Sequence, residues 1–262
     1  MAAEAEPPGM YSPYEQHALS DLGRWREQML REPGLWNRAT QGIQRRVNSY
    51  IPEKMHTAIT AVIRQMTQAV ISGSNYTAAA PLMGSDLETR EQRVRAKIDR
   101  YRKTAAVEGG VTGAGGFLLG LADFPLLIGI KLNLLFEIAG LYGHAAGDYK
   151  ERVYLLLIFQ LAFSGDAHRR DVYLRMVDWK RQRELLPPSL DDFDWRKFQQ
   201  EYRDYIDLAK LMQLVPIIGA PVGVVVNNRL VQKLGETAVN AYRMRWFDEG
   251  TTEPVLQLPE NT

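Results

Sequence analysis

The stretch VEGGVTGAGGFLLGLADFPLLIGIKLNLLFEIAGLYG, residues 107–143, decides the fold of this chain. It is almost entirely apolar, and glycine recurs at positions 109, 110, 113, 115, 116, 120, 129, 140 and 143. Each glycine inside a helix costs about 1 kcal/mol relative to alanine. So many glycines therefore need a compensating contact, and close approach of helix backbones is the usual one. Pro125 separates two predicted helices, and Asp123 lies where it would cap the second.

A second segment of the same kind is LVPIIGAPVGVVVNNRLVQKL, residues 214–234. Its VGVVVN run is β-branched and would suit a strand. It lies between helical patterns, however, and no other run alternates as a partner strand would, so we predict a helix. We expect the two glycine-rich segments to pack against each other at the centre of a compact, all-α, multi-helix bundle.

The rest of the chain is helical by periodicity. Ser12 and Pro13 are typical of a helix start, and Ser72–Gly73 of a helix end. Further helices are predicted over 88–106, 149–163, 167–185 and 194–213, and from the second glycine-rich segment to about residue 247. We predict a disordered lead-in over 1–12, a single helical domain over 13–247 and a loose tail over 248–262.

Composition excludes several classes of function. The 262 residues contain no cysteine, so disulfides, thiolate metal sites and a cysteine nucleophile are all absent. The net charge of +1 does not favour nucleic acid, and no phosphate-binding loop of the G-x-x-x-x-G-K-[ST] type suggests a nucleotide. The acidic, proline-containing N-terminus lacks the features of a signal peptide, which favours a cytoplasmic protein.

The apolar segments raise the question of a membrane. A spanning helix needs roughly 20 apolar residues, whereas 109–122 and 214–226 are shorter, and the mean hydropathy of the chain is −0.28. A multi-span protein is therefore not expected. Two readings remain open: the segments form a tightly packed core, or they contact a bilayer peripherally. The basic helix 88–106 likewise suits either an anionic membrane or an ordinary solvated face.

The two apolar segments resemble those of the EcsC family of bacterial proteins. The first signature carries Gly120, Asp123, Pro125, Glu137–Ile138–Ala139, Tyr142–Gly143 and Glu151–Arg152, and the second carries Pro216, Gly219–Ala220, Gly223 and Asn227. The stretch YEQHALSDLGRW at 14–25 adds weak support, and the similarity extends over most of 11–247. The family is named for a component encoded beside an ATP-binding-cassette transporter. The resemblance implies a helical fold and a link to a membrane, but no reaction.

Three polar residues of the first signature form a candidate metal site. Glu137, His144 and Asp148 are separated by seven and four residues, so a continuous helix would place them on one face. An imidazole and two carboxylates can hold a divalent metal with open coordination positions. Glycines at 143 and 147 weaken that geometry, and a cluster of helix caps and salt bridges is the stronger reading.

A second set of polar residues lies in apolar surroundings, and such residues need hydrogen-bond or ion-pair partners if they are buried. We predict an ion-pair network of Asp123 and Lys131, extending to Glu137, with Asn133 or Asn227 as buried polar anchors. The alternative is a polar pocket with perturbed ionisation that supports acid–base chemistry, for which the candidates are Asp123, Lys131, Glu137, His144 and Asp148.

The leading hypothesis is a non-enzymatic accessory protein at the cytoplasmic face of a membrane, with a lipid or a membrane protein as partner and a link to an ABC-type transport or secretion system. Two alternatives stay open: a metal-assisted hydrolase, and a helical bundle that binds lipid or another apolar ligand.

Overall fold

A computed structural model describes residues 11–31, 53–73, 80–113, 124–194, 196–198 and 219–250. Within these ranges the chain is all-α and contains no strand. The elements are α1 (Pro13–Leu30), α3 (Glu53–Ser72), α4 (Leu87–Gly113), α6 (Phe124–Leu141), α7 (Tyr149–Phe163), α8 (Asp166–Val177), α9 (Trp179–Leu185), the 3-10 helix η1 (Leu190–Asp192) and α12 (Gly219–Gly250). The predicted all-α class is confirmed.

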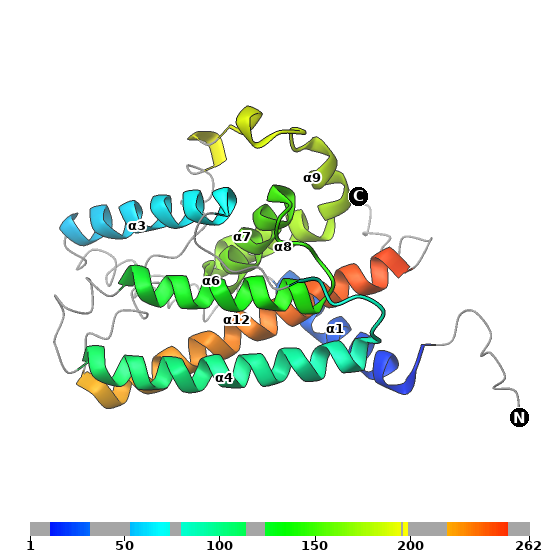
Figure 1. The fold of residues 1–262 in the computed structure, drawn as a ribbon, viewed down its shortest axis with the longest axis horizontal. Coiled ribbons are helices and arrows are strands. Elements are labelled where there is room, and N and C mark those ends of the chain that lie inside the picture. The colour runs from blue at the N-terminus through cyan, green and yellow to red at the C-terminus, as the bar shows by residue number, and fades with distance from the viewer. Residues whose placement is uncertain are drawn as a thin grey trace, which may run out of the picture.

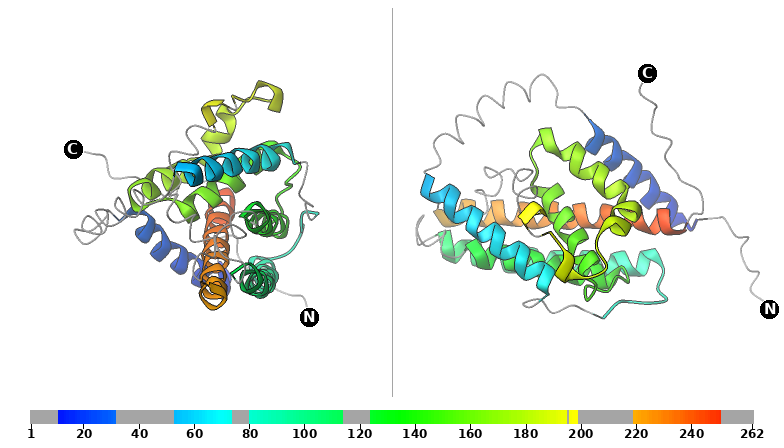
Figure 2. Two further views of the ribbon diagram at one scale, coloured as in Figure 1. Left: turned by 90° about the vertical axis from the view of Figure 1, so that its left-hand side faces the viewer. Right: turned by 90° about the horizontal axis from the view of Figure 1, so that it is seen from above.

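Three long helices, α4, α6 and α12, run side by side along the long axis of the molecule (Figure 1). Viewed end-on they form a near-parallel group, and α3, α7 and α8 cover one side of it (Figure 2). The last helix, α12, is central, since it contacts α1, α4, α6 and α7. Helices from earlier in the chain therefore meet around α12, which follows all the other described elements.

Helix α7 is the interior of the bundle. All of its residues except Lys150 are buried, which is the arrangement expected for a helix that is apolar on every side. Asp148 caps its first turn by accepting a hydrogen bond from the Lys150 amide at 2.9 Å. Its bounds, 149–163, agree with the sequence prediction because a cap precedes the apolar run and a Ser–Gly pair follows it.

Other helix ends also follow from local chemistry. Ser12 and Glu15 form a reciprocal capping box, with Pro13 in the first turn. Gly73 ends α3 with φ of +70°, a conformation that glycine adopts without strain. The VGVVVN run lies inside α12, as predicted, because no partner strand is available to it.

Three predicted helix bounds need correction. The helix expected over 88–106 continues to Gly113 within α4. The helix expected over 167–185 is two helices, α8 and α9, which meet at Asp178. Trp179 begins the second and is buried against the core, and this tertiary contact has no signature in the local pattern. The final helix also extends beyond residue 247, to Gly250.

Residues 114–123 and 214–218, at the heart of the two glycine-rich segments, lie outside the described residues, as do 1–10, 32–52 and 251–262. The close helix approach that the structure does show involves a glycine outside the first segment. A Cβ atom added to Gly235 of α12 would lie 2.6 Å from Ile98 Cδ1 of α4. By contrast, a Cβ atom on Gly129 would meet nothing within 4 Å.

Candidate functional site

Helix α12 carries two arginines, two positions apart, whose side chains are buried. Arg243 is 3% exposed and Arg245 is 6% exposed. Residues two apart on a helix are separated by about 200° of rotation, so the two guanidinium groups leave α12 in opposite directions. Each one meets a buried glutamate from another helix, and the two groups of residues that result are the most unusual polar feature of the described structure.

The first group, here called the Glu91 cluster, consists of Tyr14, Glu91, Tyr142 and Arg243. Arg243 Nε and Nη2 donate to the two carboxylate oxygens of Glu91, both at 2.6 Å, in the bidentate geometry that suits a guanidinium. The phenol groups of Tyr14 and Tyr142 donate to the same carboxylate at 2.7 and 3.1 Å. Four hydrogen bonds thus satisfy a carboxylate that has no exposure to water.

Burial and pairing shift the ionisation of this cluster. Burial lowers the pKa of Arg243, but hydrogen bonding to Glu91 and its charge outweigh that effect and raise the pKa above its usual range. Burial, reinforced by the charge of Glu91, raises the pKa of Tyr142 well above its usual value. The arginine is therefore held charged and the tyrosine neutral.

The second group, the Glu151 cluster, consists of His144, Glu151, Tyr242 and Arg245. Arg245 Nη1 donates to both oxygens of Glu151, at 2.9 and 2.7 Å, and the Tyr242 phenol donates to one of them at 2.8 Å. Arg245 Nη2 lies 3.0 Å from His144 Nδ1. Because a guanidinium can only donate, Nδ1 accepts, so the neutral imidazole carries its proton on Nε2.

Aromatic rings connect the two clusters. Tyr142 and Tyr242 stack with centroids 5.0 Å apart, and His144 stacks on Tyr242 at 5.2 Å. The Arg245 guanidinium also lies over the ring of Tyr154, 4.9 Å from its centroid. The result is a continuous polar and aromatic layer across the middle of the bundle.

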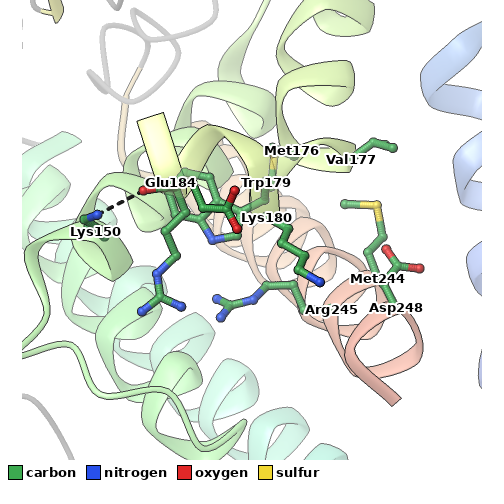
Figure 3. Close-up of a pocket in the computed structure, with 10 residues that line it drawn as sticks. Lys150, Met176, Val177, Trp179, Lys180, Glu184, Met244, Arg245 and Asp248 are labelled. Carbon is green, nitrogen blue, oxygen red and sulfur yellow. Dashed lines mark hydrogen bonds between the residues drawn. The ribbon is translucent and has the colours of Figure 1, made fainter. Parts of the chain in front are cut away.

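Each cluster borders a hollow in the surface. Arg243 lines a groove of about 610 Å³ between α1, α4 and α12. Arg245 lines a cavity of about 660 Å³ whose walls come from α7, α8, α9 and α12. Figure 3 shows Met244, Arg245 and Asp248 of α12 on one side of this cavity and Trp179, Lys180 and Glu184 of α9 on the other. Both volumes are within the range of small-molecule sites.

The structure describes part of the predicted network around Lys131. Lys131 is buried in α6, and its Nζ donates to Asn227 Oδ1 of α12 at 2.7 Å. Asn133 is half-buried on α6. Asp123 lies outside the described residues. Glu137 turns to α4 instead, where it contacts the Lys97 ammonium at 2.5 Å and accepts a hydrogen bond from the Tyr101 phenol at 2.8 Å.

The three candidate metal ligands have separate partners. Glu137 binds α4, His144 contacts Arg245, and Asp148 caps α7 and contacts Arg183 at 2.8 Å. Within the described ranges, no group of three or more His, Asp or Glu side chains is placed to hold a metal ion. The chain leaves the helix between Glu137 and Asp148, at Leu141, so the continuous face assumed from the spacing does not exist.

Sequence reasoning missed the residues that organise both clusters: Glu91, Glu151, Arg243 and Arg245. Glu151 was within the first family signature but was not assigned a role, and the two arginines alternate in an otherwise apolar stretch, AYRMRWF. That alternation was a usable signal, because charged residues this close together on a helix inside an apolar run must be paired if they are buried.

The part of the chain that the structure describes contains no helix with the length and apolar character needed to cross a bilayer. The buried ion pairs of the described residues join helices to one another. These features define an all-helical protein whose interior is organised by buried ion pairs, with two hollows beside them.

The chain belongs to the EcsC protein family, whose family model matches residues 16–247. It is similar to Protein EcsC of Bacillus subtilis (strain 168), with 40% identity over 239 residues that cover 91% of this chain and 98% of the relative. It is also similar to the uncharacterized protein YdbA of the same organism, with 30% identity over 54% of this chain and 52% of that protein. No solved structure matches the chain.

Proposed function

We propose that this protein is a non-enzymatic accessory protein that lies on the cytoplasmic face of an anionic membrane, beside a membrane complex of the transport or secretion type. The observation that carries the proposal is a row of cations on α4. Arg93, Lys97, Arg100 and Lys103 follow one another at spacings of four, three and three residues, which places them along one face of the helix.

The surface properties of this row, here called the α4 basic stripe, suit a lipid headgroup layer. Arg93, Arg100 and Lys103 are exposed. The side chain of Lys97 is 38% exposed and contacts Glu137. Between residues 89 and 104, the remaining positions on the same face, 89, 96 and 104, are threonine or alanine, so no carboxylate interrupts the stripe over this part of α4. Anionic lipids attract such residues with about 1 kcal/mol for each cation near the surface.

The position of the stripe adds apolar contact to charge. The C-terminal end of α4 lies at the same end of the bundle as the starts of α6 and α12 (Figure 1). Leu126, in the first turn of α6, is 61% exposed there. A basic helix that leads to an apolar end is the composition expected for a protein that rests on a bilayer without spanning it.

Co-sedimentation with vesicles tests the proposal. We expect the wild-type protein to bind vesicles of phosphatidylcholine mixed with phosphatidylglycerol, and to bind phosphatidylcholine alone weakly or not at all. Binding should weaken as salt rises, because the Debye length shortens to about 10 Å at 0.1 M. The triple variant Arg93→Glu, Arg100→Glu, Lys103→Glu should lose about a hundredfold in affinity, from about 1 kcal/mol for each cation removed.

A matched variant separates position from total charge. Arg181→Glu, Arg196→Glu and Lys197→Glu change the net charge by the same amount at exposed sites on another part of the surface. This variant should keep most of the affinity. Equal loss in both variants, or no binding by the wild type, would overturn the proposal.

A further inference from the structure

We propose that the cavity between α7, α8, α9 and α12 binds a small organic anion, a carboxylate or phosphate group attached to an apolar body. This site is separate from the α4 basic stripe and goes beyond the proposed membrane role. Its walls are built from four helices, and its volume of about 660 Å³ is sufficient for a metabolite or the head of a lipid.

The first observation is a buried donor that has no acceptor. Trp179 lines the cavity and is only 5% exposed, yet its indole Nε1 has no hydrogen-bond partner among the residues that the structure describes. The indole N–H of a buried tryptophan usually finds one, because an unpaired buried donor is unfavourable. The ring is held in place by Tyr154, with centroids 4.9 Å apart. Nε1 itself has almost no exposure, so an acceptor in the cavity reaches it when the adjoining side chains of the wall shift.

The second observation is the charge of the wall. Four cations line the cavity, Lys150, Lys180, Arg183 and Arg245, against two carboxylates, Glu184 and Asp248. Arg183 and Arg245 are also paired with Asp148 and Glu151, which lie outside the lining, so the wall offers charged N–H donors rather than a net positive charge. Such donors bind a carboxylate or phosphate more strongly than a neutral acceptor.

Several of these cations are fixed in advance. Arg245 is held by Glu151 at 2.7 Å, and Arg183 by Asp148 at 2.8 Å. Lys150 Nζ donates to the carbonyl oxygens of Arg183 and Leu186, at 3.0 and 3.1 Å, which fastens the end of α9 to α7. A wall whose charged groups are already ordered binds with a smaller loss of entropy than a mobile one.

The third observation selects an organic anion over a simple ion. Met176 and Met244 form part of the wall and are buried, with Val177 beside them. Methionine adapts its shape to different apolar partners. The cavity therefore offers a charged donor set next to an apolar surface, which matches an acid with a hydrocarbon or aromatic portion.

Titration calorimetry with four probes tests this site: octanoate, phenyl phosphate, octanol and inorganic phosphate. We expect saturable binding of octanoate or phenyl phosphate, and binding of octanol and inorganic phosphate that is at least tenfold weaker. Preference for octanoate would indicate a fatty acid-like ligand, and preference for phenyl phosphate a phosphorylated one. If octanol or inorganic phosphate binds as well as the organic anions, or if no probe binds, the proposal is wrong.

Variants assign the binding to the cavity. Trp179→Phe removes the indole donor and should weaken binding about tenfold or more, since a hydrogen bond to a charged acceptor is lost. Trp25→Phe is the matched control, because Trp25 is a partly buried tryptophan away from this cavity, and it should bind as the wild type does. The α4 triple variant should also bind normally. Unchanged binding by Trp179→Phe, with its thermal stability retained, would overturn the assignment.

Discussion

The Glu91 and Glu151 clusters are built from the same parts and lie in different surroundings. In each, an arginine of α12 pairs with a glutamate, through Nε and Nη2 at Glu91 and through Nη1 alone at Glu151, and a tyrosine donates to the same carboxylate. Glu91 receives a further phenol, from Tyr14, and Arg243 lines the groove between α1, α4 and α12, whereas Arg245 contacts a neutral histidine and lines the cavity between α7, α8, α9 and α12. The comparison teaches that one arrangement, a buried arginine–glutamate pair completed by phenol groups, can border two different hollows.

The largest difference should come from removing the glutamates. Glu91→Leu leaves Arg243 charged and without its carboxylate partner, which should lower the free energy of unfolding by about 3–5 kcal/mol. Glu151→Leu should cost less, because Glu151 accepts three hydrogen bonds and Glu91 accepts four. Chemical denaturation of both variants measures the difference.

Two further variants serve as controls for this comparison. If Glu91→Leu does not fold, Glu91→Gln can be used in its place, because it keeps the shape of the side chain and one acceptor oxygen. The double variant Glu91→Leu, Arg243→Leu should recover part of the loss, since no unpaired charge remains. Equal costs at Glu91 and Glu151 would show that the fourth hydrogen bond to Glu91 adds no stability.

Alkaline pH should weaken both clusters. The pKa values of Tyr142 and Tyr242 are raised well above 10.0 by burial and by the nearby carboxylates. Above about pH 10 the unfolded chain releases these protons and the folded protein keeps them, so the free energy of unfolding falls as pH rises, by about 1.4 kcal/mol per tyrosine per pH unit. This contribution is fully present below about pH 10.

Thermal unfolding followed across this range, together with tyrosinate absorbance, checks the expectation. Absorbance from the buried tyrosines should appear only with unfolding. If Tyr242→Phe removes a tyrosinate signal that develops in the folded protein, the Glu151 cluster admits water more readily than expected.

A smaller change in stability is expected from two glycines that differ in how tightly they are packed. Gly235 lies against Ile98 on the α4 side of α12, so Gly235→Ala should cost about 1–3 kcal/mol through overpacking. Gly129→Ala is the control, since nothing lies within 4 Å of an added Cβ, and it should be neutral or stabilise by up to about 1 kcal/mol. Similar melting temperatures for the two variants would contradict the close approach of α4 and α12.

The smallest predicted effect concerns Asp148, next to the Glu151 cluster. Asp148→Ala removes the cap of α7 and the partner of Arg183, and should cost about 1 kcal/mol. Asp148→Asn keeps a capping oxygen and should cost less. If instead added divalent ions raised the melting temperature of the wild type and not of Asp148→Ala, the metal-site hypothesis would gain support that the described geometry does not give it.

Local chemistry made part of this structure predictable. The cap at Ser12, the bounds of α7 and the helical state of VGVVVN all follow from residues close together in the chain. The two clusters could not be predicted in this way, because Glu91 and Arg243 are 152 residues apart and no periodic pattern relates them. The break at Asp178 was also missed, since burial of Trp179 sets it. Predicting Glu137, His144 and Asp148 as one group failed for a similar reason: a turn separates helices that the spacing had joined.

The position of α12 in the chain has a consequence for the newly made protein. Glu91 and Glu151 leave the ribosome long before the arginines that neutralise them, and the helices that will surround α12 are complete before it exists. Long-range pairings of this kind slow folding and prolong the exposure of apolar surface. Until α12 is released, the helices around it lack the arginines that pair with Glu91 and Glu151, and premature termination before those arginines would remove both ion pairs.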